Sequence, residues 1–72
     1  MSDYTTKIMV RIRERFTASG LKLEELGRKM GYSDGSARRS AWQFLNKTAD
    51  PRLSMVEKAA TALGTDVKDL LD

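Results

Sequence analysis

The stretch GLKLEELGRKMGYSDGSARRSAWQFLNKTADP, residues 20–51, decides the fold of this chain. Apolar residues recur three to four positions apart on both sides of a central turn, and this spacing predicts two amphipathic helices. We expect the first helix at about residues 23–30 and the second at about residues 36–47. The segment SDGS, residues 33–36, has turn chemistry, and Ser33 and Ser36 are candidate helix caps.

The second of these helices has two unlike faces. At 100° per residue, one face gathers the apolar positions Ala37, Ala41, Phe44 and Leu45, together with Thr48. Another face gathers the polar positions Ser36, Arg39, Ser40, Gln43 and Lys47. Arg38 and Trp42 flank the apolar face, four residues apart. The helix is therefore expected to bury one side and to present arginine, serine and glutamine on the other.

The remaining segments also show helical periodicity. A first helix to about residue 18 would bury Ile8, Met9, Ile12 and Phe16, capped by Asp3 or Thr5, with residues 1–4 frayed. The pattern Ser54-x-x-Glu57 predicts a capping box that opens a fourth helix, and Thr65 or Asp66 would cap a short fifth helix that buries Val67, Leu70 and Leu71. Five short helices without a strand signal predict one all-α domain over residues 1–72.

Glycine at position 27 falls in the middle of the first helix of the central stretch. A glycine in a helix interior costs up to about 1 kcal/mol relative to alanine. This position is understandable if another backbone passes close to it.

The composition excludes several kinds of protein. The chain has 72 residues with no cysteine and no histidine, so disulfides, the usual zinc ligand sets and the usual general base are absent. We therefore expect no enzyme, no cofactor and no small-molecule ligand. No apolar run approaches 18 residues and no signal-peptide pattern is present, which predicts a cytoplasmic protein without a membrane segment.

Charge is distributed unevenly along the chain. Residues 1–53 hold 11 basic and six acidic side chains, whereas residues 54–72 hold two and four, within a net charge of +3. Such a distribution suits a polyanion bound on one face, but taken alone it favours the alternative of a solvated surface.

Four segments, GLKLEEL, GRKMGYS, FLNKTADP and LSMVEKAATALGTDVKDLL, resemble the Xre/Cro-type, lambda-repressor-like helix-turn-helix family of phage and bacterial regulators. The resemblance covers about residues 12–71. It implies five packed helices in which the second and third form the helix-turn-helix and the third lies in the DNA major groove. It also implies a set of residues that lock these two helices together: Leu26, Gly27, Met30, Ala41 and Phe44.

Three features depart from the family pattern. The small residue in the second helix, often alanine in the family, is Gly27 here, which is compatible with the pattern. The family usually opens the second helix with Thr-Gln, whereas this chain has Lys22 and Leu23, and only Lys22 could reach a phosphate. About four extra residues also lie around positions 33–36. They either lengthen the turn or add a helical turn to the front of the reading helix.

The candidate site follows from the polar face and its neighbours. Arginine and glutamine can each form paired hydrogen bonds to base edges in the major groove. The predicted base-reading residues are Ser36, Arg39, Ser40 and Gln43. The predicted phosphate contacts are Lys22, Arg38, Lys47, Thr48 and Arg52. The alternative is that these side chains are merely solvated, which we expect for Arg11, Arg13 and Arg15.

Two neighbouring side chains have alternative roles. Trp42 could pack on the first helix, stack with Arg38 or touch the DNA sugar-phosphate edge. Asn46 is expected to cap or order the loop that follows it rather than to read a base.

These observations predict a sequence-specific double-stranded DNA-binding regulator, most simply a repressor. A homodimer is expected. Its surface would be the fourth and fifth helices near Leu70 and Leu71, unless those leucines close the monomer core instead. The alternative function is a protein-interaction module, such as an antitoxin or an adaptor, that uses the same fold.

Overall fold

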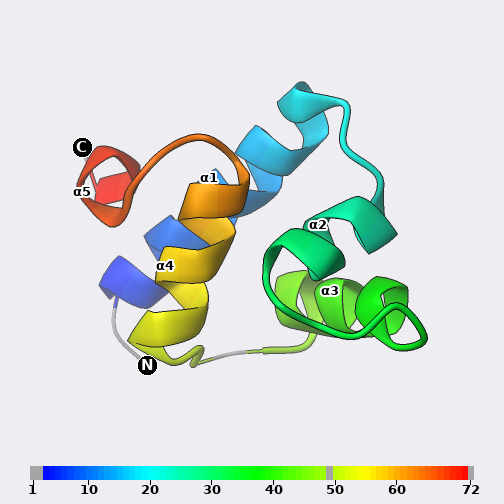
Figure 1. Ribbon diagram of the computed structural model, residues 1–72. Helices are drawn as coiled ribbons and strands as arrows, with labels where there is room; N and C mark the ends of the chain where they lie inside the picture. Colours follow the sequence, from blue (N-terminus) through cyan, green and yellow to red (C-terminus); the bar gives the residue numbers. More distant parts are fainter. Residues whose placement is uncertain (1–2, 49, 72) are drawn as a thin grey trace.

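The structure of the chain is a computed structural model that describes residues 3–48 and 50–71. It contains five helices: α1 (Asp3–Ser19), α2 (Leu23–Lys29), α3 (Ala37–Asn46), α4 (Leu53–Ala62) and α5 (Val67–Leu71) (Figure 1). The described residues include no strand, which confirms the predicted all-α class. None of these helices is both long enough and apolar enough to cross a membrane.

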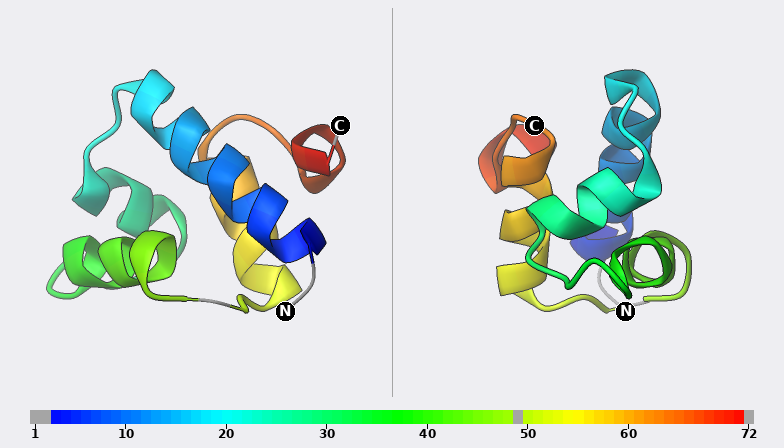
Figure 2. Two further views of the ribbon diagram at one scale, coloured as in Figure 1. Left: turned by 180° about the vertical axis from the view of Figure 1, so that it is seen from behind. Right: turned by 45° about the vertical axis from the view of Figure 1, so that its right-hand side comes forward.

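The helices α1 and α4 lie in the middle of the molecule in Figure 1. The pair α2–α3 lies on one side of them and α5 lies on the other, as the views in Figures 1 and 2 agree. The core between the helices contains one continuous cluster of buried side chains: Met9, Ile12, Leu26, Met30, Ala41, Phe44, Leu45, Val56, Ala59, Ala60 and Leu70. Because each large apolar side chain in such a cluster contributes about 1.5–3 kcal/mol on burial, this cluster holds the helices in place.

The helices α2 and α3 form the closest helix pair in the molecule. The five residues predicted to lock them, Leu26, Gly27, Met30, Ala41 and Phe44, are all buried. A side chain at position 27 would meet the backbone of Ala37, the first residue of α3. The expectation that another backbone passes close to Gly27 is therefore confirmed, and the glycine sets how closely α3 approaches α2.

Backbone hydrogen bonds end α2 and start the connection to α3. Gly31 has a φ of 97°, and its N–H donates to the Arg28 carbonyl at 3.0 Å. The Tyr32 N–H donates to the Gly27 carbonyl, also at 3.0 Å. These two bonds form a Schellman motif, which requires the left-handed backbone that glycine adopts without strain. The chain therefore leaves α2 in a fixed direction.

The segment 33–36 lies in the connection and not in α3, because α3 begins at Ala37. Of the two arrangements considered for these residues, the structure has the longer turn. The Ser36 N–H donates to the Ser33 carbonyl at 3.0 Å, and the two serine hydroxyl oxygens are also 3.0 Å apart. Ser36 precedes α3, but its side chain makes no capping hydrogen bond to the helix.

The predicted capping box at the start of α4 is wrong. The helix begins one residue before Ser54, with Arg52 at the N-cap position and no capping bond from its side chain. The N–H groups of Met55 and Val56 both donate to the Arg52 carbonyl, at 3.0 and 3.1 Å. Arg52 itself has an extended backbone, with φ −68° and ψ 146°, and the helix begins at the next residue, Leu53.

Two further helix boundaries and the exposure of one leucine differ from the predictions. The candidate caps of α1, Asp3 and Thr5, both lie inside the helix, so neither precedes it. Residues 1 and 2 lie outside the described residues. Thr48 was placed on the apolar face of α3, but the helix ends at Asn46 and Thr48 is exposed. Leu71 is 37% exposed because the short helix α5 turns only one leucine, Leu70, into the core.

The hydrogen bonds at the start of α5 show which of the two candidates, Thr65 or Asp66, caps the helix. The Asp66 carboxylate accepts a hydrogen bond from the Asp69 N–H at 2.8 Å, as an N-cap side chain does. The Thr65 hydroxyl oxygen is buried and has no hydrogen-bond partner. Asp66 is therefore the cap.

Candidate nucleic-acid interface

The helix α3 lies along one edge of the molecule, and the connection to α4 and the first turn of α4 continue that edge (Figure 1). Its inner side is buried through four residues: Ala37, Ala41, Phe44 and Leu45. Its outer side exposes six residues: Arg38, Arg39, Trp42, Gln43, Asn46 and the C-cap Lys47. The helix carries no acidic residue. A basic and polar helix face is thus presented to solvent along its whole length.

The four predicted base-reading residues occupy different settings on this edge. Arg39 and Gln43 are exposed one helical turn apart, so both side chains can extend from the same face. Ser40 is half-buried, in the wall between α3 and α4. Ser36 is half-buried in the turn, with its hydroxyl against that of Ser33. The structure therefore favours Arg39 and Gln43 as the long-reaching members of the set.

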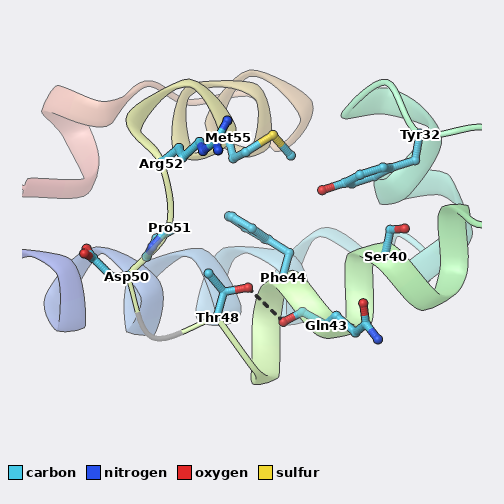
Figure 3. A pocket seen from close by; sticks show the side chains of 9 residues that line it. All are labelled: Tyr32, Ser40, Gln43, Phe44, Thr48, Asp50, Pro51, Arg52 and Met55. Carbon is cyan, nitrogen blue, oxygen red and sulfur yellow. Dashed lines mark hydrogen bonds between the residues drawn. The ribbon is translucent and has the colours of Figure 1, made fainter.

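A groove of about 420 Å³ separates α3 from the start of α4 (Figure 3). Nine residues line it: Tyr32, Ser40, Gln43, Phe44, Thr48, Asp50, Pro51, Arg52 and Met55. Tyr32, Phe44 and Met55 converge as its apolar floor, and the Gln43 carboxamide points away from Phe44 (Figure 3). The groove brings two predicted base-reading residues together with the predicted phosphate contacts Thr48 and Arg52.

The five predicted phosphate contacts are all exposed: Lys22, Arg38, Lys47, Thr48 and Arg52. The Thr48 hydroxyl donates to the Gln43 carbonyl at 3.2 Å, so this side chain is turned back onto the end of α3. Lys22 precedes α2, where its backbone N–H donates to the Glu25 carboxylate at 3.0 Å. This bond leaves the Lys22 ammonium free of the cap.

Three arginines on this edge make no ion pair with the side chains that the structure describes. Across residues 6–48 and 50–71, whose side chains the structure describes, no ion pair engages Arg38, Arg39 or Arg52. Exposed arginines commonly find an acidic neighbour one turn away on a helix, but α3 offers none. Positive charge on this edge is therefore left for an external partner or for solvent.

Trp42 and Lys47 interact with each other across the outer side of α3. The Lys47 ammonium lies over the indole ring, 5.7 Å from its centroid, which is within the range of a cation–π contact. Of the three arrangements considered for Trp42, stacking with Arg38 is replaced by this contact with Lys47. The ring also borders a smaller groove of about 220 Å³ between α1 and α3, which contains Phe16 and Leu23.

Two side chains around this groove make hydrogen bonds that fix the end of α3. The Arg13 guanidinium, on α1, donates to the Leu45 carbonyl at 2.9 Å, so the expectation that Arg13 is merely solvated is wrong. The Asn46 amide donates to the Trp42 carbonyl at 3.0 Å and thus orders the end of the helix rather than the loop behind it. The sequence carried one signal for Arg13, which stands four residues after the buried Met9, at the margin of the buried stripe of α1.

Comparison of the chain with protein-family models, with curated proteins and with solved structures finds no match. Within residues 3–48 and 50–71, no group of three or more acidic, histidine or cysteine side chains is placed to hold a metal ion.

Proposed function

We propose that this chain binds double-stranded DNA sequence-specifically and regulates transcription, most simply as a repressor, with α3 in the major groove. The single observation that carries the proposal is the outer side of α3. It exposes Arg38, Arg39, Gln43 and Lys47 with no acidic residue on the helix, and no described carboxylate neutralises its arginines. A helix with this surface is complementary to a groove lined by phosphates and base acceptors.

Base recognition is assigned to Arg39 and Gln43. The arginine can donate two hydrogen bonds to guanine O6 and N7, and the glutamine can pair with adenine N6 and N7. Because the two residues are one turn apart on one face, they would read neighbouring base pairs. Each such pairing contributes about 1–3 kcal/mol of discrimination against a wrong base. Ser36 and Ser40 would contribute shorter contacts beside them.

Phosphate contacts are assigned to the exposed cations around α3. Arg52 stands directly before α4, whose first turn has no capping side chain and lies at the same edge as α3 (Figure 1). Lys22 occupies the matching position before α2. Contacts of this kind set register and affinity but carry little sequence information. They make binding weaken steeply as salt increases.

The proposal includes a homodimer on DNA, in the cytoplasm of a bacterial host. One unit of this size reads few base pairs, and two units on half-sites about 10–10.5 base pairs apart would double the recognised sequence. Leu70 is 1% exposed and closes the monomer core, so it is not part of a dimer surface. Leu53, 63% exposed, and Leu71 are the apolar side chains that α4 and α5 leave at the surface.

The test is selection of bound sequences from a random-duplex pool, followed by fluorescence anisotropy of the selected duplex. We expect a site that binds at least about 10³-fold more tightly than random duplex, with an inverted repeat if the chain dimerises. Arg39→Ala should weaken binding to that site about 5- to 150-fold and relax preference at one base pair. Lys58→Ala, an exposed cation on α4 outside α3, is the matched control and should change affinity little. A pool that yields no preferred site would refute the proposal.

A protein-interaction module is the second candidate function, and one surface favours it. The exposed Leu53 borders a groove between α4 and α5 that also contains Val67 and the acidic residues Glu57 and Asp66. An apolar side chain beside two carboxylates would suit a basic protein partner. An antitoxin or adaptor could use this surface while α3 still meets DNA. Weak, sequence-blind DNA binding in the selection experiment would support this candidate.

A further inference from the structure

Trp42 is the only tryptophan of the chain, and 44% of its surface is exposed on the outer side of α3. Tryptophan is a large apolar residue that is usually mostly buried, and exposed examples are enriched where a partner covers them. Trp42 belongs neither to the buried core cluster nor to the partly buried side chains packed against it. The exposed ring of Trp42 is therefore a candidate contact surface for a partner.

Hydrogen bonds hold the α3 backbone at Trp42 and after it. The Asn46 amide donates to the Trp42 carbonyl, and the Arg13 guanidinium on α1 donates to the Leu45 carbonyl. One margin of the ring borders the small groove that contains Phe16. The Lys47 ammonium lies over the ring. A side chain held in this way presents a prepared surface and loses little conformational freedom on binding.

The surroundings of the ring are cationic. Lys47 lies over it, Arg13 lines the same small groove, and Arg38 stands one helical turn earlier on α3. No acidic residue lines that groove. An apolar surface framed by positive charges matches the DNA backbone, in which an apolar deoxyribose lies between two phosphates.

The helical geometry places Trp42 beside, and not in the centre of, the base-reading face. At 100° per residue, Trp42 is about 60° around the helix from Arg39 on one side, and Gln43 is about 40° away on the other. A helix that points Arg39 at the base edges would therefore turn Trp42 toward one wall of the major groove. That wall is a sugar-phosphate strand.

Resting on the DNA-binding function proposed above, we propose that Trp42 is a backbone-contacting residue. Its indole packs on a deoxyribose of one strand, and the Lys47 ammonium above the ring pairs with the adjacent phosphate. Such a contact positions α3 in the groove without reading sequence. It adds an apolar, salt-insensitive component to an interface that is otherwise held by charge.

The experiment uses the full chain and two labelled duplexes, the selected site and a random sequence. Because the chain has one tryptophan, emission excited at wavelengths that its two tyrosines do not absorb reports this ring alone. Label anisotropy measures binding, and tryptophan emission is recorded in the same titration. We expect the emission to change along the anisotropy curve for both duplexes.

Variants separate the backbone contact from base reading. Trp42→Ala should weaken binding about tenfold on both duplexes, with the salt slope unchanged. Trp42→Phe, which keeps an aromatic ring, should recover most of that loss. Lys47→Ala should reduce the slope of log affinity against log salt by about one phosphate contact. Arg39→Ala should weaken binding mainly on the selected duplex.

The possible outcomes distinguish this inference from the proposed function. Without any anisotropy change, the DNA-binding function itself is wrong and the role of Trp42 falls with it. If anisotropy reports binding while wild-type emission stays constant, the DNA-binding function stands and the Trp42 contact is overturned. If Trp42→Ala weakens binding only to the selected duplex, the residue reads a base and the sugar contact is overturned. The emission test uses the wild-type chain, so it decides the matter even if Trp42→Ala does not fold.

Discussion

Substituting Gly27 with alanine should destabilise the domain, although alanine is the better helix former. A Cβ atom at position 27 would meet the Ala37 carbonyl oxygen first, and then the Ala37 carbonyl carbon at 2.6 Å and its Cα at 2.8 Å. Carbon atoms in contact prefer separations of about 3.5–4.0 Å. Because all three contacting atoms are backbone at the first residue of α3, no side-chain rotation relieves them. The helices α2 and α3 would have to move apart.

The magnitude follows from two opposing effects. Replacing a mid-helix glycine with alanine stabilises by up to about 1 kcal/mol. Overpacking a filled interior costs about 1–3 kcal/mol, and contacts with backbone belong at the upper end because they force a helix shift. The net expectation is a loss of about 2 kcal/mol. For a domain of this size, that loss lowers Tm by roughly 8–16 °C.

The assay is thermal unfolding followed by circular dichroism, with Gly35→Ala as the matched control. A Cβ atom at Gly35 would have no neighbour within 4 Å, and the φ of Gly35 lies outside the left-handed region. The control should therefore be neutral or more stable by about 0.4–1 kcal/mol, through restriction of the unfolded chain. If Gly27→Ala unfolds at or above the wild-type temperature, α3 does not approach α2 as described. The same variant should also weaken DNA binding, since α3 would be displaced.

Three further substitutions test contacts that the structure defines. Asp66→Ala removes the cap that accepts the Asp69 N–H and should cost about 1 kcal/mol in urea unfolding, a result that an unchanged midpoint would contradict. Thr65→Val replaces a buried hydroxyl without a partner and should be neutral or stabilising by about 1 kcal/mol, whereas a clear loss would mean that the hydroxyl is bonded in solution. Arg13→Met keeps an apolar stem but removes the donor to the Leu45 carbonyl. It should lower the free energy of unfolding in urea by about 0.5–1.5 kcal/mol. An unchanged free energy would mean that Arg13 is a solvated residue.

The helices themselves could be predicted from the sequence because their signals are local. Apolar spacing defined the buried sides of α1 and α3, and Gly31 and Gly64 lie just after α2 and α4, both with positive φ. Gly27 also predicted that another backbone passes close to this position, because a glycine in a helix interior is unfavourable without a packing reason. These features depend on residues within a few positions of one another, so one sequence suffices to find them.

Helix starts were less predictable than helix interiors. Ser54 and Glu57 fit a capping box, yet α4 begins directly after Arg52, and Asp66 rather than Thr65 caps α5. A capping pattern requires a suitable residue but does not specify where the chain first becomes helical. That point depends on how the preceding loop leaves the neighbouring helix.

The sequence by itself determined five helices, a basic and polar outer side on α3, and the one-turn spacing of Arg39 and Gln43. Only the tertiary structure decided the partners of the long side chains. Arg13 on α1, for example, donates to the carbonyl of Leu45 on α3, 32 residues away. Long cationic side chains have many rotamers of similar energy, and distant neighbours select among them. Helical periodicity says which side of a helix a residue occupies, but these contacts depend on how the helices pack.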